Sequence, residues 1–229
     1  MNSVVCTRIY ESDKLPFNRA EALRYFGYVK AKSEPSENVA AIFGECVKEA
    51  KAACTYKVCY AKFDISRKGE TIDLGFTTTN SHSLSRNLEG CEQVIAFAAT
   101  VGIGIDRLIS RYAKTDPVKS YAFQAIGAER IETLCDAFNA DVTAAFAKEN
   151  LFTRPRFSCG YGDFLLEKQT DFFIALDCPR KIGVTLNESL LMSPSKSVTA
   201  IIGAGRSVCR NESHKCASCY DRENCQFRK

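Results

Sequence analysis

The chain has 229 residues, of which 45% are hydrophobic and 25% are charged, with a formal net charge of +4. This composition is typical of a globular protein, and the length is sufficient for one large domain or for one domain with a small appendage. The apolar runs are too short for a membrane-spanning helix, and the scattered Lys and Arg residues do not by themselves indicate a nucleic-acid partner. Charges interrupt the apolar residues between Met1 and Asp13, unlike in a secretory signal, so we expect a cytoplasmic protein.

Helix and strand patterns alternate in the first part of the chain. After an N-terminal strand, Asn18 can cap a short helix that Gly27 would end. Residues 37–54 carry apolar side chains at helical spacing and predict a second, amphipathic helix. Residues 56–65 alternate in polarity, and residues 71–77 follow across an Arg-Lys-Gly-Glu turn, which predicts the two strands of a hairpin.

A compact apolar strand is predicted for residues 91–100, followed by Gly102 and Gly104 and then by a helix over residues 105–112. A strand that meets a helix through glycines can place backbone amides near a ligand. Two spaced glycines without a third do not make a dinucleotide-binding fingerprint, and a tight turn is the simpler interpretation.

The longest helical pattern runs from Asp116 to about Lys148, with Pro117 suited to its first turn. Its apolar stripe is interrupted by Glu132 and Asn139. A buried carboxylate needs a partner, so Glu132 either finds one or lies at the edge of the stripe near water. The predicted stripe consists of Tyr121, Ala125, Ala128, Glu132, Cys135, Asn139, Val142 and Phe146.

The remaining part of the chain combines an irregular loop with short elements. The run RPRFSCGYGDF, residues 154–164, predicts an extended loop because it combines arginines with two glycines. A helix is predicted for residues 167–176, ended by Cys178-Pro-Arg, a short strand for residues 182–186, and a core strand for residues 195–203.

Three segments of the chain together carry a resemblance to a known family: RFSCGY at residues 156–161, the run at residues 182–198 and AERIE at residues 128–132. They resemble the activation domain of cobalamin-dependent methionine synthase, in which an arginine, three residues and Gly-Tyr form a motif similar to residues 156–161. Residues 182–198, IGVTLNESLLMSPSKSV, resemble the family's strand and following loop, and residues 128–132, AERIE, resemble part of its long helix. The resemblance covers about residues 90–205 and is less clear over residues 1–90.

The resemblance implies an α+β fold in which helices flank a twisted antiparallel or mixed sheet. Residues 1–205 would form the activation-domain-like, S-adenosylmethionine-binding domain, and residues 206–229 would form a small Cys-rich tail. One departure affects the loop: the family's Gly-Tyr is usually followed by a proline-containing turn, whereas this chain continues with Gly162 and Asp163.

The resemblance also implies a set of ligand-binding residues. Arg156 would hold the carboxylate of S-adenosylmethionine through its planar guanidinium. Without the surrounding match, the simpler interpretation would be a surface arginine or one partner of a plain ion pair. Ser158 would act through its backbone against the adenine, and Gly160 belongs to the same set. Tyr161 would lie beside the ligand on the side that faces the corrin ring, and Glu132 would point toward the cationic ligand.

The activity implied is reactivation, in which a methyl group from S-adenosylmethionine and one electron restore an inactive Co(II) corrinoid. No corrinoid-binding motif is recognised in the chain, so the cobalamin would be carried by a partner, either a cobalamin-dependent methionine synthase or another corrinoid protein. Flavodoxin or ferredoxin would be the electron donor. This chain would contribute the positioning of the methyl donor, as a component of a methyltransferase system.

The twelve cysteines fall into two groups. Eight of them are scattered between Cys6 and Cys178, where burial as a small hydrophobic residue is the simplest interpretation. The other four, in a tail poor in aliphatic residues, have a spacing typical of thiolate metal sites and could hold zinc, an iron–sulfur cluster or no metal. These four candidate metal ligands are Cys209, Cys216, Cys219 and Cys225.

Two alternative functions remain open at this point. Basic residues around the tail cysteines suggest a zinc-knuckle protein with salt-sensitive affinity for nucleic acid, which is the less favoured interpretation. An activator that serves a different corrinoid methyltransferase system would have the same binding site for S-adenosylmethionine.

Overall fold

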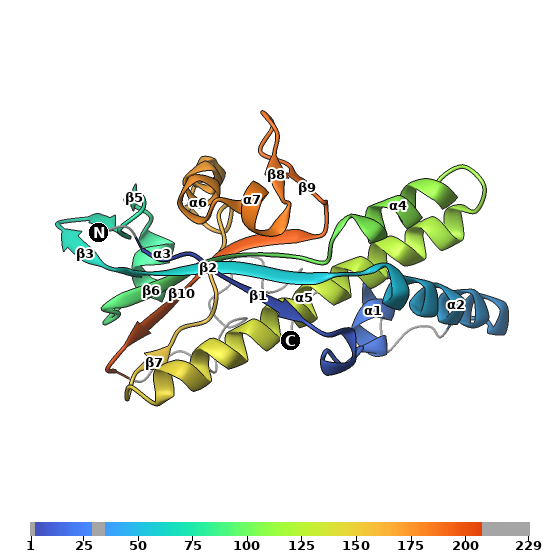
Figure 1. The fold of residues 1–229 in the computed structure, drawn as a ribbon, viewed down its shortest axis with the longest axis horizontal. Helices are drawn as coiled ribbons and strands as arrows, with labels where there is room; N and C mark the ends of the chain where they lie inside the picture. The colour runs from blue at the N-terminus through green and yellow to red at the C-terminus, as the bar shows by residue number, and fades with distance from the viewer. Residues whose placement is uncertain (1–2, 29–34, 208–229) are drawn as a thin grey trace.

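A five-stranded antiparallel sheet forms the centre of the molecule (Figure 1). The computed structural model describes residues 3–28 and 35–207. From one edge to the other, the strands are β1 (Cys6–Tyr10), β2 (Tyr56–Asp64), β6 (Gln93–Thr100), β10 (Ser197–Gly205) and β7 (Phe152–Thr153).

The central strands β6 and β10 are buried over nearly their whole length because both faces of the sheet are covered. Successive side chains of a strand point to opposite faces. Val58 and Phe97 therefore pack in one hydrophobic cluster, whereas their neighbours Cys59 and Ala98 pack in the other. The consequence is a molecule of three layers, with helices on one face and a mixed layer on the other.

The helical layer is built around the long helix α5 (Pro117–Ala147), which crosses one face of the sheet (Figure 1). The Asp116 side chain caps it by accepting a hydrogen bond from the Lys119 amide at 3.0 Å. Asn18 caps α1 in the same way, and Gly27 follows that helix with a positive φ. The other helices of this layer are α1 (Arg19–Tyr25), α2 (Glu37–Ala53) and α4 (Ile103–Tyr112).

Short elements cover the opposite face of the sheet. The helices are α3 (His82–Asn87), α6 (Gln169–Leu176) and α7 (Cys178–Ile182). Two small sheets accompany them, one of β3 (Ser66–Lys68), β4 (Thr71–Asp73) and β5 (Thr78–Thr79), the other of β8 (Thr185–Leu186) and β9 (Met192–Ser193). Single 3-10 turns, η1 (Ser12–Lys14) and η2 (Leu166–Lys168), precede α1 and α6.

The structure corrects three sequence-based expectations. The strand at residues 56–64 pairs with β1 and β6, and the predicted hairpin is instead formed by β3 and β4. Cys178 begins α7 rather than ending a helix, because Asp177 takes a left-handed conformation that separates α6 from α7. The buried face of α5 is also wider than the predicted stripe, since this helix packs against the sheet and against other helices at once, while Tyr121 is exposed.

The α+β architecture inferred from the resemblance is confirmed, with a sheet that is antiparallel throughout. Within the described residues, no helix combines the length and the apolar character required to cross a bilayer. Five of the eight cysteines in this part of the chain are buried, in agreement with their predicted role as small hydrophobic residues.

Candidate functional site

Arg156 bridges two carboxylates on α5. Its Nη2 lies 2.5 Å from Glu132 Oε2, and its Nη1 lies 2.5 Å from Asp136 Oδ1. The two acids are four residues apart, one turn of the helix, so their side chains share one face. Arg156 is held in place because the next residue, Phe157, pairs through its backbone with Ile201 of β10.

This cluster carries one negative charge in excess, since two carboxylates face one guanidinium. Burial by itself would lower the pKa of Arg156, but the acidic groups around it raise that pKa above its usual range, so the guanidinium stays protonated. Burial raises the pKa of the neighbouring Cys135 thiol to about 12. Burial, with a smaller contribution from the negative charge of Glu132, raises the pKa of Tyr25 in α1. The site therefore suits a ligand that combines a carboxylate with positive charge.

The loop that follows Arg156 presents Tyr161 to solvent. The tyrosine is 66% exposed, and its ring packs edge-on against Phe157 with a centroid distance of 5.3 Å. The loop is tight: the Gly160 amide donates to the Phe164 carbonyl at 2.7 Å, and the Tyr161 amide donates to the Ser158 carbonyl at 3.3 Å. Gly160 has a φ of +81°, a conformation that favours glycine.

Asp163 fastens the end of this loop to α3. Its carboxylate accepts hydrogen bonds from the His82 and Ser83 amides at 2.7 and 3.0 Å and from the Ser81 hydroxyl at 2.5 Å. These hydrogen bonds, led by that of Ser81, hold the pKa of Asp163 well below its usual range. Gly162 is needed here because its φ is +58° and a Cβ would lie 2.8 Å from the Ser83 hydroxyl oxygen. The Gly-Asp departure from the family motif thus has a structural role.

An open groove of about 500 Å³ adjoins the cluster. One wall is the segment 16–19, and the other is the face of α5 that carries Thr133, Asp136 and Ala137. Asp136 thus belongs both to the groove and to the cluster around Arg156. The volume of the groove lies within the range that is usual for small-molecule binding sites.

A buried ion pair positions the wall of this groove. Arg130 Nε lies 2.6 Å from Glu129 Oε2, and Arg130 also donates to the Leu15 and Pro16 carbonyls at 3.0 and 2.8 Å. The Asn18 amide donates to Glu129 at 2.9 Å. The segment before α1 is therefore tied to α5 at three backbone positions.

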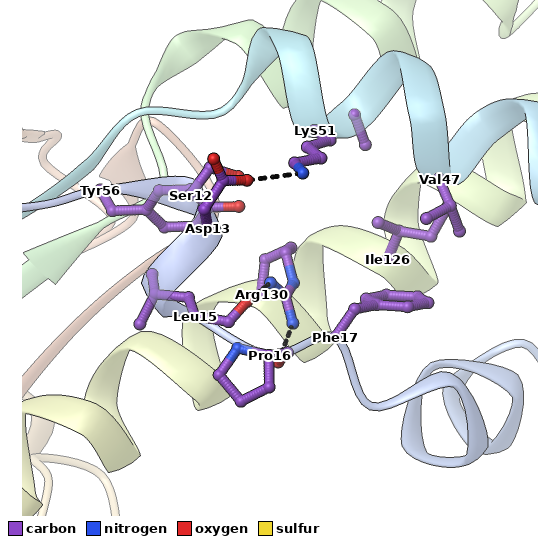
Figure 2. Close-up of a pocket in the computed structure, with 11 residues that line it drawn as sticks. Ser12, Asp13, Leu15, Pro16, Phe17, Val47, Lys51, Tyr56, Ile126 and Arg130 are labelled. Carbon is purple, nitrogen blue, oxygen red and sulfur yellow. Dashed lines mark hydrogen bonds and ion pairs between the residues drawn. The ribbon is translucent and has the colours of Figure 1, made fainter.

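A second cavity, of about 240 Å³, shares Pro16 and Phe17 with the groove in its lining (Figure 2). Residues of α2, of the start of β2 and of α5 line it together with the segment 12–17. None of the sequence-predicted binding residues lines it. The lining consists of Ser12, Asp13, Leu15, Pro16, Phe17, Val47, Ala50, Lys51, Tyr56, Ile126 and Arg130.

The structure brings Glu132 and Arg156 together, in direct contact, and places Ser158, Gly160 and Tyr161 in the adjoining loop. Their roles toward a ligand remain predictions. Asp136 was not singled out from the sequence, although its spacing of four from Glu132 is a usable signal. Cys209, Cys216, Cys219 and Cys225 lie outside the described residues, and within residues 3–28 and 35–207 no group of His, Cys, Asp and Glu could hold a metal ion.

Comparison with solved structures reveals a similar fold. The MetH reactivation domain bound to AdoHcy matches with a TM-score of 0.63 and 15% sequence identity. The match covers 87% of this chain and 78% of that one. No protein-family model and no curated protein sequence matches the chain. The likeness therefore shows a fold in common with that reactivation domain.

Proposed function

We propose that this protein binds S-adenosylmethionine and supports the reductive methylation of a corrinoid held by a partner protein. The observation that carries the proposal is the contact of Arg156 with Glu132 and Asp136 beside an open groove. A fold similar to that of the MetH reactivation domain supports the proposal, since that domain was crystallised with AdoHcy, the demethylated form of S-adenosylmethionine.

The charges of the cluster match those of S-adenosylmethionine. The ligand carries one carboxylate, one ammonium and one sulfonium, and therefore one net positive charge. Arg156 uses one N–H of each terminal nitrogen for Glu132 and Asp136, so three of its five donors remain for the ligand carboxylate. The two acids would then lie beside the positively charged groups and stabilise them.

Tyr161 suits a contact that forms only with the partner. It is exposed, while its ring is held against Phe157. A rigid aromatic side chain with a polar tip is a common anchor at interfaces. We infer that Tyr161 meets the corrin face of a cobalamin-dependent methionine synthase or of another corrinoid protein, with a flavodoxin or ferredoxin supplying the electron.

The proposal is tested in two stages. Calorimetry should detect S-adenosylmethionine binding, and Arg156→Ala should weaken it by about 2 kcal/mol because a charge-assisted hydrogen bond to the ligand is lost. Arg156→Lys should restore only part of this affinity, since an ammonium does not reproduce the guanidinium fork. Arg180→Ala, which removes an exposed arginine of α7, is the matched control and should bind as the wild type does.

The second stage follows the appearance of methylcobalamin absorbance. A Co(II) methionine synthase, a reductant and S-adenosylmethionine are mixed with or without this protein, and the absorbance should rise faster when it is present. Tyr161→Ala should slow the rise more than it weakens ligand binding, whereas Ile9→Ala, at an exposed apolar residue of β1, should change neither. No acceleration with any corrinoid partner would overturn the proposal, and salt-sensitive binding of oligonucleotides would favour the nucleic-acid alternative.

A further inference from the structure

The 240 Å³ cavity between α2, α5 and the segment 12–17 has the features of a second binding site (Figure 2). We propose that it binds a small carboxylate with an apolar body, a class that includes short-chain organic acids and apolar amino acids. This inference does not depend on the proposed function, because Arg156, Glu132 and Tyr161 do not line the cavity.

The first observation is a buried hydroxyl without a partner. Tyr56 is 2% exposed and lines the cavity. Its hydroxyl oxygen has no partner in hydrogen-bonding geometry among the described residues, although Arg130 and Ser12 lie close enough to lower its pKa. Leaving such a group unpaired is unfavourable, so a polar atom of a ligand is a natural partner. Burial raises the pKa of Tyr56, which keeps the hydroxyl protonated and able to donate.

The second observation is the polarity of the cavity. Figure 2 shows Tyr56, Ser12 and Asp13 together at one end, with Lys51 beside them. Val47, Ile126 and Phe17 lie at the opposite end. A ligand with one polar terminus and an apolar remainder fits this division, because each part then meets groups of its own kind.

The third observation is an ion pair that can exchange partners. Lys51 Nζ lies 2.7 Å from Asp13 Oδ1, but the two side chains are 62% and 83% exposed. Exposed pairs of this kind contribute little to stability. A ligand carboxylate can therefore replace Asp13 at Lys51 while it accepts a hydrogen bond from Tyr56. In an amino acid, the ammonium would in turn pair with the released Asp13.

The volume limits the ligand to a small molecule. A cavity of 240 Å³ corresponds to about eight water molecules at liquid density. Arg130 is the other charged group of the lining, but Glu129 and the Leu15 and Pro16 carbonyls engage its guanidinium. The Tyr56 hydroxyl and Lys51 are therefore the groups that select the carboxylate.

The test uses the full chain and titrates hexanoate, 3-phenylpropanoate, L-methionine and L-leucine, with hexan-1-ol as the uncharged analogue. The carboxylates should give calorimetric binding and raise Tm, and hexan-1-ol should bind at least tenfold more weakly. Tyr56→Phe should weaken carboxylate binding about tenfold, the typical effect of losing one hydrogen bond to a charged group. Lys51→Gln should weaken it several-fold, while Lys48→Gln, on the same helix and outside the cavity, should have no effect.

Two further variants make the outcome decisive. Val47→Phe fills the apolar end and should abolish binding, and Arg156→Ala should leave it unchanged. Tighter binding of the amino acids than of the simple acids identifies an amino acid as the ligand, and the reverse identifies a simple carboxylate. Absence of binding by every probe at millimolar concentration, equal binding of hexan-1-ol, or a lower Tm of ligand-free Tyr56→Phe would overturn the proposal.

Discussion

At the scale of single residues, Asp163 attaches the end of the loop that contains Tyr161 to α3. Its carboxylate accepts three hydrogen bonds from residues at the start of α3. A negative charge near a helix N-terminus is favourable because the free amides there carry partial positive charge. One side chain thus connects the candidate binding loop to the layer beneath it.

The pH dependence of stability should reveal this role. The pKa of Asp163 is depressed in the folded protein, so the carboxylate stabilises the fold above its unfolded pKa of about 3.9, and this contribution is lost as the pH falls through the folded value. Asp163→Asn should lower Tm between pH 5 and 7, and the difference from the wild type should narrow below about pH 4. Asp73→Asn, at an exposed acid outside this cap, is the control; a Tm difference that does not depend on pH would contradict the prediction.

At the scale of elements, the pair Glu129 and Arg130 joins the segment before α1 to α5. Both side chains are almost fully buried, with exposures of 1% and 6%. They stabilise the fold only together, because removing one leaves the other charge uncompensated in the interior. The pair positions the segment that lines both the open groove and the 240 Å³ cavity.

Breaking this pair should be costly. Arg130→Met should lower the free energy of unfolding by about 3 to 5 kcal/mol, because Glu129 remains buried as an isolated charge. The double variant Glu129→Leu/Arg130→Met should lose less than the sum of the two single variants. Arg8→Met, which removes an exposed ion pair with Asp141, should cost less than about 1 kcal/mol. Urea denaturation measures the free energy of unfolding of each variant. A loss below about 1 kcal/mol for Arg130→Met would contradict the predicted contribution of the pair to stability.

At the scale of the whole molecule, the three-layer fold and the cysteine tail pose separate questions. The fold resembles the MetH reactivation domain, whereas Cys209, Cys216, Cys219 and Cys225 lie outside the described residues. Four thiolates at this spacing predict a bound metal. A zinc ion would be structural, and an iron–sulfur cluster would suit a protein whose partner needs an electron.

Protein purified without oxygen should therefore contain zinc or iron. Elemental analysis identifies the metal, and a visible absorption band distinguishes a cluster from zinc. Cys216→Ser and Cys219→Ser should each lose the metal, because thiolates are the expected ligands. Cys6→Ser, at an exposed cysteine of β1, should retain it. Folded wild-type protein that contains no metal would contradict the prediction that the four tail cysteines form a metal site.

Local signals in the sequence were sufficient to predict several elements. Helical periodicity and capping residues predicted α1, α2 and α5, and an unbroken apolar run predicted β6. These patterns depend on hydrogen bonds and side-chain spacing within one segment, so they can be recognised in the amino-acid sequence of that segment. The resemblance assigned Arg156 and Glu132 each to the ligand, and their direct contact with one another is seen only in the structure.

The sequence by itself determined the longer helices α2 and α5 and the apolar strand β6, and its resemblance to a family suggested the α+β class and the candidate residues on α5 and in the loop at residues 156–161. Only the tertiary structure decided that Asp136 completes the Arg156 cluster, that Glu129 and Arg130 hold a segment more than 100 residues away, and that the Tyr56 hydroxyl is buried without a partner. The physical reason is that these features depend on how three layers pack, and the partners of a side chain across a layer leave no periodic pattern along the chain.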